Sequence, residues 1–179
     1  MNSDHSTLQA KAAELRQVFD ESFASPERDG RKLVEHMIVI QVGGEPFAVS
    51  LREISGLTIT KGTILPVPSS VPELVGITGI RGVVVPVFSL SALLGIKSNT
   101  ERHRWLILSS AAQSTIALAV DLVEGHLEVP MDAFITRASG SGSHYVKQTI
   151  KHGEILLRVI DVAMLLGKIR QQGAFAPTP

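Results

Sequence analysis

From about Val34 onward the chain alternates short apolar segments with turn residues. The apolar segments are rich in valine, isoleucine and leucine, and stretches of glycine, proline and serine separate them. This pattern is typical of many short β-strands joined by turns. The strand-like segments are VEHMIVIQV, PFAVSL, LTIT, GVVVPVF, RWLILS, TIALAVDLV, TIKHG and EILLRVI. The sequence therefore predicts a mainly β fold built from barrels.

The first 32 residues follow a different pattern. Apolar side chains recur at steps of three or four between residues 8 and 23, which is the period of an amphipathic helix. Ser6 and Gln9 have the spacing of a capping box, and the Ser-Pro pair at 25–26 ends the helix. We expect an N-terminal amphipathic helix and tether over residues 1–32. Two alternatives remain open: the helix packs on its own domain, or it docks on a partner.

The β region also repeats itself. The matching segments are FAVSLREISG (47–56) with IALAVDLVEG (116–125), and PVFSLSALLG (86–95) with RVIDVAMLLG (158–167). Both matches occur in the same order and at nearly the same offset. We therefore expect two similar β halves, at about 34–96 and 104–168. Together they form one domain over residues 33–168, and a C-terminal tail follows over 169–179.

Each half is expected to begin with a hairpin and to end with a strand that runs into a short helix. In the second half, Asp161 is the expected N-cap of this helix and Gly167 its expected end. Pro86 lies inside a strand-like segment of the first half. Because proline donates no ladder hydrogen bond, we expect this strand at a sheet edge or at a bulge.

The composition narrows the range of functions. The chain of 179 residues is 44% hydrophobic, contains no cysteine, and balances 17 basic against 17 acidic residues. Nucleic-acid binding usually needs a clustered basic surface, so the balanced charge argues against it. The missing cysteines remove disulfides, thiol nucleophiles and cysteine-ligated zinc. The N-terminus lacks a signal-peptide pattern and no apolar run approaches the ~20 residues that span a bilayer, so we expect a cytoplasmic protein.

No motif in the sequence is typical of a catalytic or cofactor site. Gly76, Gly79 and Gly82 have the spacing G-x-x-G-x-x-G, which matches neither the phosphate loop nor the dinucleotide fingerprint. None of the six histidines forms H-x-x-x-H or H-E-x-x-H, and no carboxylate stands at ligand spacing from them. The serines at 139–143 have the composition of a loop and not of a nucleophile elbow. We expect no enzyme activity, no cofactor and no metal.

Arg81 is the polar residue that stands out. It lies between two glycines, directly before the most apolar stretch of the chain. Three roles remain open for it: a strand-end charge in water, a guanidinium held by a carboxylate, or an exposed anchor beside an apolar groove. Arginine is enriched among the residues that anchor protein interfaces.

The segment VGITGIRGVVVPVFSL, which contains Arg81, resembles the signature of CheW-like domains, the coupling proteins of bacterial chemotaxis. IVIQVGGEPFAVSLREISGL is similar to the first hairpin of this family. RWLILSS and TIALAVDLVEGHLEVP are similar to the opening of its second half, and HYVKQTIKHGEILLRVIDVAMLL to its closing strands and helix. The resemblance covers about residues 34–168. It implies two five-stranded barrels on a shared apolar core, with no catalysis and no cofactor.

The resemblance also implies two partners. These are the cytoplasmic tip of a methyl-accepting chemoreceptor and the CheW-like regulatory domain of a CheA-type histidine kinase, so we expect the protein at receptor arrays of the inner membrane. Partner binding is carried over to Ile54, at the aliphatic position after the first hairpin. It is also carried over to Gly76 and Arg81, which match the signature's small residue and its arginine. Val83 and Val85 follow, because they alternate on one face of the next strand.

Two positions depart from the family pattern. Gly56 stands where the family usually has a carboxylate suited to holding the arginine. Arg81 is then expected to pair with Glu53 or Glu73, or to stay free for the partner. Ser89 replaces an acidic residue and is a candidate cap of the short helix.

The leading hypothesis is a non-catalytic, stand-alone coupler of receptor and kinase, since the chain begins with methionine and is too short to contain a kinase as well. One alternative is a small β-barrel module for another ligand, such as an oligosaccharide or single-stranded nucleic acid. The single tryptophan and single tyrosine argue against it, because such modules use exposed aromatic side chains. Another alternative is a coupler in a two-component pathway other than chemotaxis. The oligomeric state stays open.

Overall fold

The computed structural model describes residues 33–60, 64–97, 105–111, 114–136 and 144–172. The chain divides into two units after Leu33, and the description concerns the second unit, from Val34 onward. The helix expected over residues 1–32 and most of the expected tail lie outside the described residues. None of the helices in the described ranges is long and apolar enough to cross a membrane.

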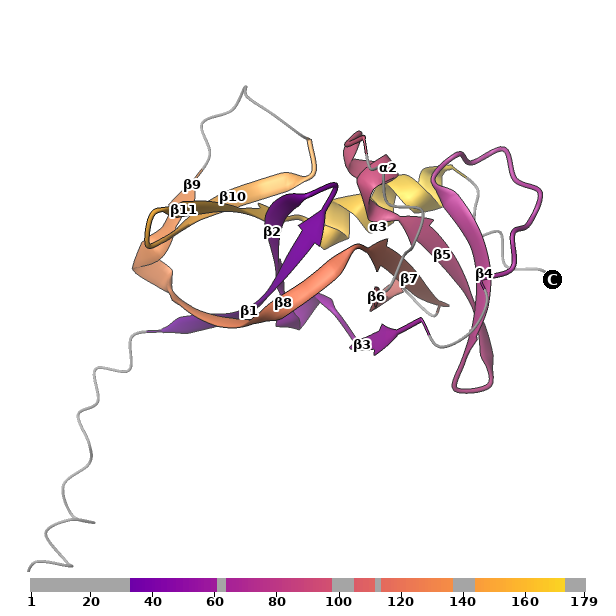
Figure 1. Cartoon of the computed structure of the whole chain (residues 1–179), viewed down its shortest axis with the longest axis horizontal. Coiled ribbons are helices and arrows are strands. Elements are labelled where there is room, and N and C mark those ends of the chain that lie inside the picture. The colour runs from indigo at the N-terminus through magenta and orange to yellow at the C-terminus, as the bar shows by residue number, and fades with distance from the viewer. Residues whose placement is uncertain (1–32, 61–63, 98–104, 112–113, 137–143, 173–179) are drawn as a thin grey trace, which may run out of the picture. The chain divides into compact units, whose positions relative to one another are not determined.

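The described part of the chain is mainly β, with short helices (Figure 1). The strands are β1 (Val34–Val42), β2 (Glu45–Ser50), β3 (Gly56–Ile59), β4 (Leu74–Ile80), β5 (Val83–Ser89), β6 (Trp105–Ala111), β7 (Ser114–Val120), β8 (Leu122–Pro130), β9 (Phe134–Thr136), β10 (Val146–His152) and β11 (Ile155–Ile160). The helices are α2 (Leu90–Leu94) and α3 (Val162–Gln171), with 3₁₀ turns η1 (Leu51–Glu53) and η2 (Met131–Ala133).

The strands form two sheets. A six-stranded sheet has the order β8-β1-β2-β11-β10-β9, and a five-stranded sheet has the order β3-β6-β7-β5-β4. The predicted mainly β fold is confirmed. The predicted barrels are wrong in two respects: one sheet has six strands, and neither sheet closes by hydrogen bonds within the described ranges, since its first and last strands are not neighbours.

The internal repeat of the sequence is visible as a repeated strand order. The hairpin β1–β2 corresponds to β6–β7, strand β3 to β8, and β4–β5–α2 to β10–β11–α3. In both sheets the hairpin meets its neighbour through a parallel pair, β2 with β11 and β5 with β7. Each hairpin, however, lies in the sheet that holds the remaining strands of the other half. The predicted halves, 34–96 and 104–168, therefore both contribute to both sheets.

A shared apolar core joins the two sheets and the helices. It contains Phe47 of the six-stranded sheet, Phe88 and Leu118 of the five-stranded sheet, Leu90 of α2 and Leu165 of α3. These side chains are at most 1% exposed. Each sheet also has a smaller apolar cluster of its own, separate from the shared core. The sheets are thus packed on both faces, which explains the near-continuous apolar runs in the sequence.

The helix caps follow the sequence closely. The Asp161 carboxylate accepts a hydrogen bond from the Met164 N–H at 2.9 Å, and the Ser89 hydroxyl accepts one from the Ala92 N–H at 3.3 Å. Both predicted N-caps are confirmed. Gly167 does not end its helix, because α3 continues to Gln171. Its last turn is retained by tertiary contacts, since Ile169 is buried in the shared core.

Pro86 lies in a central strand, so its predicted place at a sheet edge is wrong. β5 stands between β7 and β4, and the bulge is in β4, between Leu74 and Gly76. Pairing with β7 begins only at Val87. On the other side, Ile77 lies opposite Pro86 but exchanges its backbone hydrogen bonds with Leu65, at 2.8 Å each. The missing N–H of the proline therefore costs no ladder bond.

Candidate partner-binding site

A groove separates the two edge strands of the five-stranded sheet. Residues 55–60, which include β3, form one wall, and residues 78–81, at the end of β4, form the other. Leu106 and Leu108 of β6 lie at its base, and its volume is about 260 Å³. We call it the β3–β4 groove. β3 and β4 are the two edge strands of the sheet in the described ranges, and the outer side of β4 is bridged to Leu65 at Ile77.

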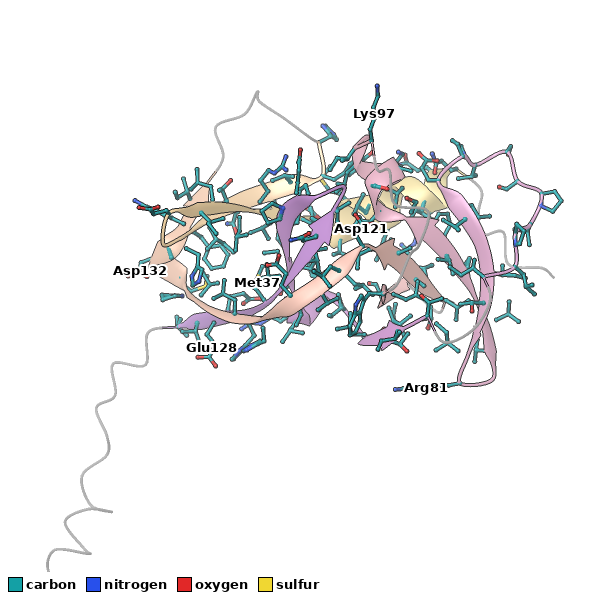
Figure 2. All side chains as sticks on the ribbon, viewed as in Figure 1. Met37, Arg81, Lys97, Asp121, Glu128 and Asp132 are labelled. Atoms are coloured by element: carbon teal, nitrogen blue, oxygen red, sulfur yellow. The ribbon has the colours of Figure 1, made fainter. Side chains whose placement is uncertain are left out.

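Arg81 sits at the tip of the hairpin that joins β4 to β5. Ile80 pairs with Val83, so Arg81 and Gly82 are the two turn residues, with φ of 51° and 80°. Positive φ at both positions is the mark of a type I′ turn, which favours asparagine, aspartate and glycine. Arginine is an uncommon choice there, and uncommon backbone states are kept where function requires them. Figure 2 shows its side chain extending from the hairpin tip toward β3.

The Arg81 guanidinium is exposed and takes part in none of the ion pairs found among the described residues. Glu53 is held by Lys147, with 2.8 Å between Oε2 and Nζ. Glu73 is held by Lys168, with 2.8 Å between Oε1 and Nζ. Both carboxylates that were expected as partners of Arg81 thus form ion pairs with lysines. Within the part of the chain that the structure describes, the arginine has no acidic partner and lies exposed at the rim of the groove.

Exposed aliphatic side chains surround this arginine. Val83 and Val84 are 59% and 67% exposed at the start of β5. On the opposite wall, Leu57 and Ile59 project from β3 with about two-fifths of their surface in solvent. Consecutive residues of a strand face opposite sides, so exposure of both valines means that the hairpin tip extends beyond the packed sheet. A cation ringed by exposed aliphatic groups is a feature of interaction surfaces.

The five residues carried over from the family resemblance occupy three different environments. Arg81 and Val83 are exposed at the hairpin tip. Ile54 is half-buried against the shared core, directly before the groove wall begins at Ser55. Gly76 and Val85 are buried, and Val85 is only 1% exposed. Val85 belongs to the apolar cluster within the five-stranded sheet, so its side chain is not presented to a partner.

Gly76 has a structural reason to be glycine. Its φ is 154°, in a region that other residues rarely adopt. A Cβ atom at this position would overlap the carbonyl oxygen of Leu65, which bridges to β4 next to Gly76. Gly76 therefore lets the segment around Leu65 approach β4 closely. It affects the groove by fixing the position of β4, whose end forms one of the groove walls.

Sequence reasoning does not identify the exposed apolar residues of the groove wall and of the adjacent hairpin tip. Leu57, Ile59 and Val84 read as ordinary strand residues, because nothing in a short apolar alternation says which face meets solvent. Glu73, a candidate partner of Arg81 in the sequence, pairs with Lys168 instead. Lys168 donates a hydrogen bond to its carboxylate and thereby holds the pKa of Glu73 below its usual range, against the opposing effect of burial. This pair ties the start of β4 to α3.

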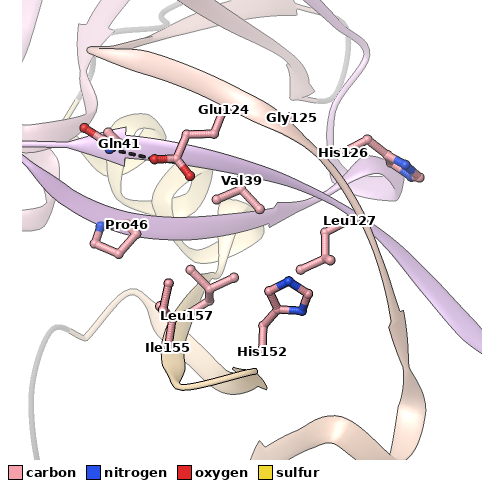
Figure 3. A pocket seen from close by; sticks show the side chains of 10 residues that line it. All are labelled: Val39, Gln41, Pro46, Glu124, Gly125, His126, Leu127, His152, Ile155 and Leu157. Carbon is pink, nitrogen blue, oxygen red and sulfur yellow. Dashed lines mark hydrogen bonds between the residues drawn. The ribbon is translucent and has the colours of Figure 1, made fainter.

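A second pocket, of about 460 Å³, lies in the six-stranded sheet (Figure 3). It is lined by β1, by β8, by the β10–β11 hairpin and by Pro46 of β2. β1, β8 and the β10–β11 hairpin are the counterparts of β6, β3 and the β4–β5 hairpin. Ile155 and Leu156 are exposed at its hairpin tip, like Val83 and Val84 at theirs. The turn at this tip consists of Gly153 and Glu154. The hairpin at the β3–β4 groove has Arg81 and Gly82 in the same place, so the two pockets differ by the arginine at the hairpin tip.

The β3–β4 groove is suited to binding rather than to catalysis. Its lining offers hydroxyl groups, aliphatic side chains and one arginine, but among the described residues it contains no histidine or carboxylate to act as a base. An arginine at the rim can accept a partner's carboxylate in a bidentate pair. Edge-strand backbone groups and small apolar contacts can add to such a contact.

Comparisons with known proteins agree with this architecture. The family model of the CheW-like domain matches residues 36–170, which contain nearly all of both sheets and of α3. The crystal structure of the scaffolding protein TtCheW from Thermoanaerobacter tengcongensis is similar with a TM-score of 0.65. The two sequences are 16% identical, and the similarity covers 72% of this chain and 89% of that chain. A search among curated protein sequences returned no match.

Proposed function

Because this chain belongs to the CheW-like domain family, we propose that it is a non-catalytic scaffold that couples chemoreceptors to a CheA-type histidine kinase. The observation that carries this proposal is the exposed Arg81 at the rim of the β3–β4 groove, without a carboxylate partner among the described residues. The family resemblance assigns such a coupler two partners, the cytoplasmic tip of a methyl-accepting receptor and the kinase regulatory domain. This function implies a cytoplasmic position at receptor arrays of the inner membrane.

We assign the partner contact to the exposed members of the predicted set and to their neighbours. Arg81 pairs with a carboxylate of the partner, and Val83 with Val84 supplies apolar area beside it. Ile54 fixes the start of the opposite wall by packing on the core. Gly76 and Val85 contribute indirectly, since they hold the hairpin in place. Arginine is enriched among interface hot spots, which makes Arg81 the expected anchor of the contact.

A capture experiment tests the function. The full chain is immobilised, incubated with extract of the native cell, and its bound proteins are identified by mass spectrometry. The proposal expects a methyl-accepting receptor and a CheA-type kinase among them. Recovery of the kinase alone would indicate that Gly56, in place of the usual carboxylate, has weakened the receptor contact. Recovery of neither would contradict the coupling function.

A further inference from the structure

Three side chains with metal-binding atoms meet on one face of the β1–β8 strand pair. His36 lies on β1, and His126 with Glu128 lies on β8. In the strand register His36 stands opposite Glu128, and Ile38 stands opposite His126. Residues two apart on a strand share a face, so both β8 side chains are within reach of His36. Figure 2 labels Glu128 on this outer surface, and Figure 3 shows His126 pointing away from the nearby pocket.

The distances within this His-His-Glu cluster are those of a nearly formed metal site. Nδ1 of His36 lies 3.0 Å from Nε2 of His126 and 3.8 Å from Oε1 of Glu128. All three ligand atoms lie within 4.8 Å of one another. A tetrahedral zinc ion with bonds of about 2.0–2.1 Å separates its ligand atoms by roughly 3.3 Å. Small side-chain rotations therefore bring the three atoms to coordinating distance.

The two imidazole rings are already joined by a hydrogen bond between Nδ1 of His36 and Nε2 of His126, in which one ring donates and the other accepts. Their planes differ by 19° and their centroids are 5.2 Å apart, so the rings stack. A neutral imidazole has one protonated nitrogen and one with a free lone pair, so a change of tautomer in the donating ring leaves a lone pair on both facing nitrogens, within 4.8 Å of the Glu128 carboxylate. A divalent cation there would satisfy two lone pairs and one negative charge at once.

We propose that His36, His126 and Glu128 bind one divalent transition-metal ion of the zinc class, with solvent in the remaining coordination position. Two imidazoles and one carboxylate suit zinc, nickel or copper, whereas magnesium and calcium prefer ligand sets made of oxygen. The site is independent of the β3–β4 groove and of the coupling function. Its histidines are 90 residues apart in the sequence, which is why motif spacing does not reveal it.

The position of the cluster indicates what the ion does. β8 is an edge strand of the six-stranded sheet, and its pairing with β1 is interrupted by a register shift between Val39 and Ile40. The cluster lies on the side of this shift toward the start of β1. A bound ion cross-links the two strands there. Because it binds only the folded chain, it raises the stability of that fold.

Titration of the metal-free full-length chain with zinc chloride tests the site. Calorimetry should show one ion per chain, and zinc should raise the melting temperature while magnesium and calcium do not. His36→Gln and His126→Gln should each weaken zinc binding by at least about tenfold, the loss that follows even from disturbing the outer shell of a metal site. His152→Gln is the matched control, because His152 lies in the neighbouring pocket outside the cluster.

Cobalt provides a second readout. Cobalt(II) in a site of low coordination number absorbs visible light strongly, and this absorption should appear in the wild type and disappear in His126→Gln. Unchanged melting temperatures of the metal-free variants verify that they fold. Absence of zinc binding, or binding that both cluster variants retain, would overturn the proposal. Partner capture repeated in a chelator should be unaffected, so failure of this site and failure of the coupling function are separable.

Discussion

At the scale of single residues, Arg81 combines an unfavourable backbone conformation with an exposed side chain that forms no ion pair among the described residues. Its φ of 51° places it in the left-handed region, which costs a non-glycine residue roughly 1–2 kcal/mol. Asparagine tolerates this region better and is preferred in type I′ turns. The turn is therefore less stable with arginine than with asparagine, but the arginine places a guanidinium at the rim of the β3–β4 groove.

We expect Arg81→Asn to raise the free energy of unfolding by up to about 1 kcal/mol while partner capture falls. The reason is that the turn relaxes at the same time as the charged contact is lost. Urea denaturation measures the first effect through a higher midpoint at unchanged slope. A lower midpoint would show instead that the arginine side chain stabilises the hairpin.

A substitution at Gly76 is expected to lower the free energy of unfolding. Gly76→Ala should destabilise the protein by about 2 kcal/mol or more, because the new Cβ overlaps the Leu65 carbonyl and the φ of 154° is strained for alanine. Gly79→Ala is the matched control in the same strand, since nothing lies within 4 Å of its added Cβ. Thermal melts of the two variants compare them directly. Equal effects would contradict the close approach of Leu65 to β4.

At the scale of elements, the start of β4 is tied to α3 by one ion pair, Glu73 with Lys168. The pKa of Glu73 is lowered in the folded protein, chiefly by the hydrogen bond from Lys168. A lowered folded-state pKa means that the stabilisation is complete above the unfolded value and is lost as pH falls through the folded one. The usual value of 4.5 therefore marks the upper end of the window in which it declines.

Glu73→Gln should accordingly lower stability by about 2 kcal/mol at pH 7, and this difference should shrink below about pH 4.5. Denaturation of wild type and variant across this range checks the expectation. Glu154→Gln, in the exposed turn between β10 and β11, is the control variant and should stay close to wild type at pH 7. A Glu73→Gln difference that is independent of pH would contradict the role of the carboxylate charge.

The elements also show how far sequence reasoning reaches. Strand segments, the caps Ser89 and Asp161, and the placement of Arg81 beside a glycine turn follow from local patterns. The predictions for Gly167 and Pro86 were wrong, because contacts with distant segments outweigh the local rule. Burial of Ile169 in the shared core extends α3 past Gly167. Pairing of β5 with β7 begins only at Val87, so Pro86 can lie in a central strand. The pairing of Glu53 and Glu73 with lysines could not be predicted from the sequence either, because Lys147 and Lys168 are distant along the chain.

At the scale of the whole domain, the central feature is the exchange of hairpins between the two halves. The repeat in the sequence identifies equivalent strands, but it does not say which strands pair, because pairing partners are set by the shared core and not by local pattern. β1 and β2 pair with strands that come after residue 120, whereas β6 and β7 pair with strands before residue 90. Neither half holds a complete sheet.

We therefore expect fragments 1–100 and 101–179 to remain unfolded when separate and to fold together when mixed. Each fragment alone exposes an apolar hairpin face whose partner strands are absent. Circular dichroism and size-exclusion chromatography of the separate and mixed fragments make the comparison. Cooperative unfolding of either fragment by itself would mean that the halves are autonomous.

The measurement that tests the coupling function most directly is quantitative capture of receptor and kinase by Arg81→Glu compared with Lys97→Glu. Both changes reverse an exposed positive charge, and Figure 2 shows the two side chains on opposite sides of the described domain. The proposed function predicts that Arg81→Glu loses at least about tenfold in capture of one partner while its melting temperature is kept, as expected of an interface anchor, and that Lys97→Glu captures like wild type. Equal capture by the two folded variants would contradict a role of the β3–β4 groove in partner binding.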